Sequence, residues 1–408
     1  MNTIFVAIAA YRDPELLPTL KNCLSQAAFP ERVHFGIVWQ HADEDSWDTI
    51  EEYRYNPNFK IVDVDYRASK GVCWARHEMQ KLYNGETYYL QLDSHHRFDK
   101  HWDIKLVTML QGLQEQGYPK PLITAYATAY DPGTEERSEE PWKLNFDRFA
   151  PDGVVHFTPG GIPDYQTLSG PIPSRFLSAH FIFTLGQFCT EIPYDPEYYF
   201  HGEEISLAVR AFTHGYDLFH PHKVIIWHEY IRKNKAKHWA DNNWSDIDKR
   251  AKEKNRQLLG VDSDPIHIET YGLGTTRSLR DYEMYAGIEF KTRRIHKHTV
   301  EEKNPPVPLE DFESQLAGYK KYCIDIYKES VREPDYDFWV VVFKDSEGNE
   351  IHREDASEEE IQRIMNEDQD NLFAQVWRKF YSNIEATHWL IWPHSCSKEW
   401  CDIIEGTL

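Results

Sequence analysis

The sequence predicts an α/β protein organised around a parallel β-sheet, followed by a small α+β unit. Apolar, β-prone segments alternate with helical patterns through roughly the first hundred residues, which is typical of parallel strands joined by right-handed crossovers. The segment at residues 87–92 is mostly aromatic and aliphatic, as in a central strand buried on both faces, and it ends abruptly at Asp93, Ser94 and His95. Ligands bind at the carboxyl ends of the strands in such sheets, so we expect a site at this edge.

The other elements of the first part follow from the same patterns. Strands are expected at residues 3–10, 33–39, 60–65 and 87–92, and helices at residues 13–26, 45–53, 70–83 and 101–116. Residues 121–130 are expected to be extended. The polar stretch at residues 131–167, which contains Gly160, Gly161 and several prolines, predicts a mobile loop or lid.

The second part of the chain supplies further elements and a change of composition. A strand is expected at residues 177–183, a helix at residues 203–213, a β-hairpin at residues 216–227 and a basic helical segment at residues 234–260. Residues 303–308 are charged and proline-rich, which predicts a linker between a domain of residues 1–300 and a smaller domain of residues 301–408. In the smaller domain we expect strands at residues 337–344, 350–353 and 388–392, and helices at residues 357–367 and 371–380.

The strongest candidate site is a metal centre formed by Asp93, His95 and His228. Asp93 and His95 are two residues apart, directly after the buried strand, and both can turn onto one ion. A second apolar strand, at residues 223–227, presents His228 at its end in the same way. An oxygen donor together with nitrogen donors suits Mn²⁺ or a similar divalent cation. The alternative is that both strands end in polar turns at the surface.

Two other features are candidates for ligand binding. The loop that contains Gly272, Gly274 and Arg277 is glycine-rich and runs into a helical pattern, so its backbone amides and the guanidinium can cradle a diphosphate. No Walker lysine follows it, and a Gly-x-Gly sequence alone is common. Glu203 and Glu204 lie in the first turn of a predicted helix, where two carboxylates also balance the helix dipole.

Composition limits the classes of partner. The formal charge is −22, which repels phosphate backbones and anionic lipids, so we expect neither nucleic acid nor membrane as the main partner. No segment is long and apolar enough to span a bilayer, and the N-terminal segment lacks the pattern of a signal peptide. The six cysteines are scattered, without a Cys-x-x-Cys pair. Free thiols in a reducing cytosol, and hence a cytoplasmic protein, are the simplest expectation.

Several ordered blocks within roughly residues 1–290 point to a family. They are Ala9-Ala10-Tyr11-Arg12-Asp13, Asp93-Ser94-His95, Tyr194-Asp195-Pro196 before Gly202-Glu203-Glu204-Ile205-Ser206, and Gly272-Leu273-Gly274 with Arg277. Together they resemble the glycosyltransferase (GlcNAc) family, the retaining polypeptide α-N-acetylglucosaminyltransferases of glycosyltransferase family 60. The Asp-Ser-His triplet, the Gly-Glu-Glu sequence and His228 are more distantly similar to the polypeptide N-acetylgalactosaminyltransferases.

This resemblance implies a GT-A fold, a UDP-GlcNAc donor, Mn²⁺ (or Mg²⁺) and transfer to a hydroxyl acceptor with retention of configuration. It implies that Asp93, His95 and His228 hold the metal, and that Asp93, Glu203 and Glu204 are the catalytic residues, with neither glutamate acting as a nucleophile. The residues implied for donor binding are Ala9, Tyr11, Arg12, Asp65, Arg67, Lys70, Arg76, Ser94, Gly272, Gly274 and Arg277. The acceptor stays open between a polypeptide and a glycan.

Two other classes of function compete with this expectation. A sugar-1-phosphate nucleotidyltransferase shares a similar sheet and a carboxylate-bound metal, but it carries a glycine-rich loop after its first strand, where this chain has Ala9-Ala10-Tyr11-Arg12-Asp13. A non-catalytic carbohydrate-binding or peptide-binding protein would make use of the 13 Trp and 24 Tyr, although most aromatic residues lie in cores. The small C-terminal domain shows no catalytic constellation and is expected to have a structural or partner-binding role, including homo-oligomer formation.

Overall fold

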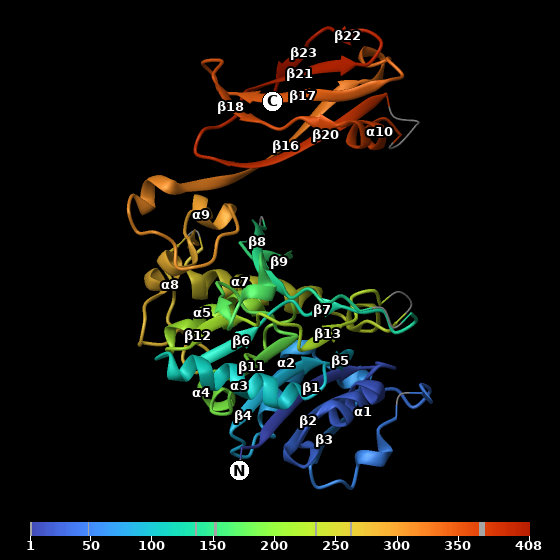
Figure 1. Ribbon diagram of the computed structural model, residues 1–408, viewed down its shortest axis with the longest axis vertical. Helices are drawn as coiled ribbons and strands as arrows, with labels where there is room; N and C mark the ends of the chain where they lie inside the picture. Colours follow the sequence, from blue (N-terminus) through green and yellow to red (C-terminus); the bar gives the residue numbers. More distant parts are fainter. Residues whose placement is uncertain are drawn as a thin grey trace. The chain divides into compact units, whose positions relative to one another are not determined.

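The structure is a computed structural model that describes residues 2–47, 49–134, 137–150, 153–232, 235–261, 263–366 and 372–408. The chain forms two compact units, Met1–Ser314 and Gln315–Leu408 (Figure 1). In the described part of the chain, no helix combines the length and the apolar character needed to cross a bilayer.

The first unit is built on a mixed sheet of eight strands in the order β10-β12-β6-β11-β4-β1-β2-β3. The strands are β1 (Ile4–Tyr11), β2 (Val33–His41), β3 (Phe59–Asp65), β4 (Tyr88–Asp93), β6 (Pro121–Thr124), β10 (Ile172–Pro173), β11 (Phe181–Leu185) and β12 (Asp217–His220). β3, β2, β1 and β4 are parallel, as predicted. The expectation of a wholly parallel sheet is wrong, because β11 lies antiparallel between β4 and β6.

The first unit also contains α-helices, and the first five of them lie between strands of this sheet along the chain (Figure 1). The helices are α1 (Leu16–Gln26), α2 (Val72–Gln80), α3 (Trp102–Glu115), α4 (Phe188–Glu191), α5 (Glu203–Thr213), α6 (His238–Asp241), α7 (Ser245–Leu259), α8 (Leu279–Ala286) and α9 (Lys297–Val300). The core contains fully buried apolar side chains from the central strands and from α1 and α3, among them Val6, Leu20, Leu90 and Leu106. Burial of β4 on both faces explains why its sequence is apolar until Asp93.

A second, three-stranded sheet joins the end of β4 to a distant part of the chain. It consists of β5 (His96–Phe98), β13 (Ile226–His228) and β7 (Thr128–Ala129), with β13 in the centre. The β-hairpin expected at residues 216–227 is therefore wrong. β12 pairs with β6 in the large sheet, whereas β13 pairs with β5 and β7 in the small one.

One expected loop and one expected helix differ from the structure. The stretch predicted as a mobile loop or lid contains an antiparallel pair, β8 (Trp142–Phe149) and β9 (Val155–Gly161), with Leu144 and Val155 buried. The acidic helix expected at residues 45–53 is reduced to a single 3₁₀ turn at Glu51–Tyr53, and Asp48 lies outside the described residues. The first unit also contains the short antiparallel pair β14 (Ile288–Glu289) and β15 (Arg294–His296), which precedes α9.

The second unit is mainly β-structure (orange to red in Figure 1). Its elements are β16 (Leu316–Tyr327), β17 (Tyr336–Lys344), β18 (Glu350–Arg353), β19 (Ala356–Ser357), α10 (Glu358–Asn366), β20 (Phe373–Ser382), β21 (His388–Ser395), β22 (Glu399–Trp400) and β23 (Ile404–Thr407). β16 pairs with β20, and β17 pairs with β18, β19 and β21. Trp339, Val341, Val376 and Ile391 lie in a common core with residues of α10.

The helix expected at residues 371–380 is wrong, because this segment forms β20. Its side chains alternate between buried (Ala374, Val376) and exposed (Gln375, Trp377), which is the period of a strand. The helix expected at residues 357–367 is present as α10, while Glu367 and Asn371 lie outside the described residues.

Candidate metal centre and donor cavity

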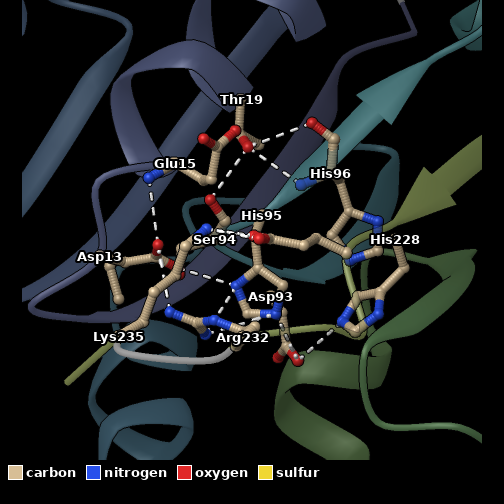
Figure 2. Close-up of polar contacts among 12 residues, drawn as sticks. Asp13, Glu15, Thr19, Asp93, Ser94, His95, His96, His228, Arg232 and Lys235 are labelled. Carbon is tan, nitrogen blue, oxygen red and sulfur yellow. Dashed lines mark hydrogen bonds and ion pairs between the residues drawn. The ribbon is translucent and has the colours of Figure 1, made fainter. Parts of the chain in front are cut away.

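The topology of the two sheets brings Asp93, His95 and His228 together. β4 ends at Asp93, the chain turns through Ser94 and His95, and β5 begins at His96. β13 pairs with β5 so that His228 lies opposite His96. The ends of β4 and β13, which are far apart in the sequence, therefore meet at one edge of the large sheet (Figure 2).

The three side chains offer a coherent set of ligand atoms. Their nearest donor atoms all lie within 4.8 Å of one another, and this is the one cluster of its kind among the residues that the structure describes. Asp93 Oδ2 lies 3.9 Å from His95 Nε2 and 3.5 Å from His228 Nε2. One carboxylate oxygen with two imidazole nitrogens is a donor set that fits Mn²⁺ and similar divalent cations.

His228 is prepared to act as a ligand. It is buried, and neither of its ring nitrogens makes a hydrogen bond to another described residue. Burial lowers the pKa of His228 to about 3, although the nearby Asp93 acts in the opposite direction. The imidazole is therefore neutral near neutral pH, and its unshared electron pair is available to a cation. Buried polar atoms without hydrogen-bond partners are rare, so this imidazole fits a role as a ligand to a cation.

Asp13 orients the imidazole ring of His95 through a contact with its Nδ1 atom. Asp13 Oδ2 lies 2.8 Å from His95 Nδ1 and accepts a hydrogen bond from Ser94 Oγ at 2.5 Å (Figure 2). Arg232 Nη2 lies 3.2 Å from Asp13 Oδ1. Burial would raise the pKa of Asp13, but His95, Arg232 and Ser94 hold it well below its ordinary value. A carboxylate that accepts the Nδ1 proton leaves Nε2 free for a metal, as in many metal sites.

Thr19 of α1 fixes the turn that carries these residues. Its hydroxyl donates to the backbone oxygens of Ser94, at 2.9 Å, and His96, at 3.1 Å, and it accepts the backbone N–H of His96 at 3.0 Å. His96 itself is fully buried, and its Nδ1 lies 2.9 Å from the backbone oxygen of Trp227. The position of His95 is therefore held from both the backbone and the side chain.

Arg76 keeps Asp93 ionised. Its Nη2 donates to Asp93 Oδ1 at 2.6 Å and its Nη1 donates to Glu203 Oε1 at 2.7 Å. Cys73 Sγ lies 3.0 Å from the other oxygen of Glu203. Burial raises the pKa of Asp93, yet Arg76, His228 and His95 together hold it well below its ordinary value. Arg76 and Glu203 therefore lie behind the metal ligands as a buried, paired support.

A cavity of about 320 Å³ opens onto Asp93 and His95, and His228 lies within 4.8 Å of both without lining it. Of the residues predicted from the sequence, Ala9, Tyr11, Asp93, Ser94 and His95 line it. Sequence reasoning missed the rest of the lining, which consists of Val72, Tyr199, Phe200, Tyr230, Arg232, Ala236, Lys237, His238 and Trp239. A mostly pre-formed cavity with a few convergent polar groups is typical of a small-molecule site.

The sequence profile of the family described as Glycosyltransferase (GlcNAc) matches residues 3–55 and 49–292 of this chain. These matches cover more than half of the 408 residues and include every part of the cavity. The chain belongs to the glycosyltransferase (GlcNAc) family. The mixed α/β sheet of its first unit is of the fold class that the resemblance of its sequence blocks implies.

Other comparisons give weaker likenesses. No curated protein matches the chain. The crystal structure of GalNAc-T7 with UDP, GalNAc and Mn²⁺ is 13% identical, with a TM-score of 0.47, and the match covers 63% of this chain and 48% of that one. TarS (residues 1–349) from S. aureus in complex with UDP-GlcNAc is 12% identical, with a TM-score of 0.37, over 59% of this chain and 61% of that one. The chain thus spans about half the length of GalNAc-T7.

Four of the residues that the sequence assigns to donor binding lie outside the cavity. Arg12 makes two hydrogen bonds to Asp45, at 2.6 and 3.0 Å. Asp65 and Arg67 are exposed and pair with each other at 2.9 Å. Lys70 lines a different cavity, together with Pro196, Glu197, Ile247, Arg250 and Lys254. The structure therefore brings Ala9 and Tyr11 to the donor cavity, but not these four residues.

Glu204 differs from Glu203 in its surroundings. Its Oε1 accepts the backbone N–H of Ala179 at 2.9 Å, and its Oε2 lies 3.4 Å from the hydroxyl of Tyr126. Burial raises the pKa of Glu204 to about 7, with Glu203 adding to the effect and the Ala179 hydrogen bond opposing it. Neither glutamate lines the cavity. Their contacts therefore favour a role in holding neighbouring groups over direct contact with a sugar.

The glycine-rich loop does not reach the site. The N–H of Gly274 donates to Thr213 Oγ1 at 2.8 Å, at the last residue of α5. Arg277 donates to Asp217 at 2.8 Å and packs on the ring of Phe212. α5 begins beside Arg76 and is about 16 Å long, so this loop lies at the end of the helix that is remote from the metal ligands. The predicted diphosphate cradle of Gly272, Gly274 and Arg277 is corrected to a packing role.

Proposed function

We propose that this chain transfers GlcNAc from UDP-GlcNAc to a hydroxyl group on a polypeptide or glycan, with retention of configuration and with Mn²⁺ or Mg²⁺ as cofactor. The observation that carries the proposal is the cluster of Asp93, His95 and His228, with donor atoms within 4.8 Å, of which Asp93 and His95 line a 320 Å³ cavity. The family to which the chain belongs supports glycosyl transfer as the chemistry proposed for that cavity.

The residues around the cluster have distinct tasks. When bound, the divalent cation would neutralise the negative charge that develops on the diphosphate leaving group. Asp13 Oδ2, at 2.8 Å from His95 Nδ1, favours the tautomer that carries the proton there and leaves Nε2 for a metal, although Arg232 Nη1, which can only donate, lies 2.9 Å from the same nitrogen. Arg76 holds Asp93 ionised, and burial holds His228 neutral. Each ligand is thus kept in the protonation state that metal binding needs.

The proposed transfer breaks the bond between the anomeric carbon and the β-phosphate oxygen, and UDP leaves with the electron pair. The acceptor hydroxyl oxygen forms a new bond to the anomeric carbon on the same face, and its proton passes to the departing phosphate oxygen. No protein base is needed for this proton balance. Ala9 and Tyr11, at the end of β1, are placed in the cavity wall where they can contact the nucleotide.

Incubation with UDP-GlcNAc and Mn²⁺ tests the proposal. A transferase releases UDP slowly, and release increases when an acceptor is added. A sugar-1-phosphate nucleotidyltransferase requires pyrophosphate, and a non-catalytic binder releases nothing. Absence of metal-dependent UDP release across a panel of UDP-sugars would contradict the proposal. The cytoplasmic location and a homo-oligomer formed through the second unit stay predictions.

A further inference from the structure

A second cavity, of about 340 Å³, adjoins the donor cavity. Tyr199, Phe200 and Trp239 line both cavities, so the two share a wall. Beyond this wall the second cavity is lined by His201, Trp244, Asp248 and Lys252. A molecule seated there lies beside the place where the proposed transfer occurs. We call Tyr199, Phe200, Trp239 and Trp244 the aromatic wall.

Three members of the aromatic wall are exposed to a degree that packing does not explain. Phe200 is 45% exposed, Trp239 is 47% exposed and Trp244 is 38% exposed. Large aromatic side chains that gather on a surface and line a cavity mark binding sites more often than isolated exposed residues do. Their faces are apolar and carry negative charge density, which suits contact with polarised C–H groups.

Tyr199 is the buried member of the aromatic wall and holds it in place. It is buried, its hydroxyl lies 2.8 Å from His238 Nδ1, and its ring is stacked on that of Trp244, with 5.8 Å between centroids. Gly71 has a φ of +107°, and a Cβ atom there would lie 2.8 Å from the Tyr199 ring. The absence of a side chain at Gly71 thus allows Tyr199 to pack closely. The aromatic wall is therefore held in position before any ligand arrives, which lowers the entropic cost of binding.

The polar residues of the second cavity indicate what the aromatic wall binds. Asp248 is buried and pairs with Lys252 at 3.0 Å, so the cavity combines a carboxylate, an ammonium group and the imidazole of His201 with aromatic faces. A sugar ring matches both parts, because its C–H groups form an apolar face and its hydroxyls both donate and accept at the rim. A proline-rich peptide also fits aromatic grooves, but it can donate to the Asp248 carboxylate only from its non-proline N–H groups and side chains, whereas each sugar ring carries several hydroxyl donors.

We propose that the second cavity binds a sugar ring of a glycan acceptor against the aromatic wall, so that the acceptor of this glycosyltransferase is a glycan. This inference rests on the proposed function, since it places the acceptor next to the proposed donor cavity. Trp244 is its most specific residue, because it lines the second cavity and not the first.

The test uses the full chain with UDP and Mn²⁺ on a printed array of neutral oligosaccharides and of peptides that contain Ser, Thr or hydroxyproline. We expect retention on oligosaccharides, reduced about tenfold in Trp244→Ala and less in Trp244→Phe, which keeps a ring on Tyr199. The matched control is Trp377→Ala, which removes a tryptophan of similar exposure (46%) from β20 in the second unit and should bind as the wild type does. Thermal melting of each variant checks that it is folded.

The possible results separate the two proposals. Binding of UDP and Mn²⁺ without retention on any oligosaccharide, or oligosaccharide binding that Trp244→Ala and Trp244→Phe leave unchanged, overturns the glycan inference. Retention on peptides that depends on Trp244 overturns it in favour of a polypeptide acceptor. A wild-type protein that binds neither UDP nor Mn²⁺ contradicts the proposed function itself.

Discussion

The carboxyl edge of the large sheet and the glycine-rich loop at residues 271–277 carry similar expectations from sequence, because each combines residues that suit a diphosphate. In the structure their surroundings differ. At the sheet edge, His228 keeps two buried nitrogens without hydrogen-bond partners among the described residues, and a cavity opens onto Asp93 and His95. In the loop, Gly274 and Arg277 are engaged with Thr213 and Asp217 of the same unit.

This comparison shows how to distinguish a glycine or an arginine that binds a ligand from one that only packs against its neighbours. A Cβ atom at Gly274 would lie 2.5 Å from the backbone of Thr213, so close helix packing alone accounts for this glycine. By contrast, the imidazole of His228 in β13 is buried although neither of its nitrogens makes a hydrogen bond to a described residue, and its Nε2 lies 3.5 Å from Asp93 Oδ2. α5 links the two regions, because Glu203 at its start supports Arg76 and Thr213 at its end meets the loop.

The largest expected effect comes from the sheet edge. Asp93→Asn keeps the shape of the side chain but removes its charge, and His228→Ala removes a nitrogen ligand. We expect each to lower Mn²⁺-dependent UDP release by about 10²–10³-fold or more, because the charge of the leaving group would then lack its counter-ion. A coupled assay for UDP measures this. Full activity in either variant, with an unchanged melting curve, would contradict the assignment of these residues as metal ligands.

The second effect tests the orientation of His95. Asp13→Asn should weaken Mn²⁺ binding by about 10–100-fold, since the outer carboxylate fixes the tautomer of the ligand. Calorimetric titration with Mn²⁺ measures the affinity. The matched control is Asp45→Asn, which removes another arginine-paired carboxylate that does not contact His95. Equal loss in both variants would point to general electrostatics instead of orientation.

The glycine-rich loop should respond in stability and not in ligand affinity. Gly274→Ala places a methyl group against the end of α5 and should lower the free energy of unfolding by roughly 1–3 kcal/mol. The affinity for UDP should stay unchanged. Gly170→Ala is the matched control, because a Cβ atom there meets nothing within 4 Å. Urea unfolding and UDP titration together decide the matter, and a loss of UDP affinity in a stable Gly274→Ala protein would restore the diphosphate role.

The smallest effect concerns the start of α5. The pKa of Glu204 rises from an ordinary 4.5 to about 7 on folding, so its protonated form is favoured in the native state. Its contribution to stability is present below about pH 4.5 and is lost as the pH rises through about 7. In Glu204→Gln, the loss of stability between about pH 5 and pH 8 should be smaller than in the wild type, by on the order of 1–3 kcal/mol. Urea unfolding at the two pH values measures it, and an identical pH dependence would refute the shift.

Sequence reasoning found the site where a local pattern encodes it. An apolar strand that ends in polar residues identifies Asp93 and His95 at the carboxyl edge of the parallel strands. His228 follows a similar apolar strand, and the family resemblance singled it out as the third ligand. Sequence reasoning missed Asp13, Thr19 and the aromatic wall because their contacts are remote along the chain. Asp13 and His95 are 82 positions apart, and no local periodicity reports such a pairing.

The fold shows the same limit. The α/β order of β1 to β4 was accessible from alternating patterns, but the antiparallel insertion of β11 depends on pairing across the sheet. β20 was expected to be a helix because its sequence contains good helix formers, while its burial alternates along a strand that pairs with β16. Tertiary pairing overrides local propensity in such segments.

The most direct test of the central claim is Mn²⁺ binding in the presence of UDP, followed by electron paramagnetic resonance, for the wild type, His228→Ala and Arg277→Ala. The account predicts that the wild type and Arg277→Ala bind Mn²⁺ with similar affinity and that His228→Ala loses this binding. Unchanged Mn²⁺ binding in a folded His228→Ala protein, or its loss in a folded Arg277→Ala protein, would contradict the assignment of the metal centre to the sheet edge.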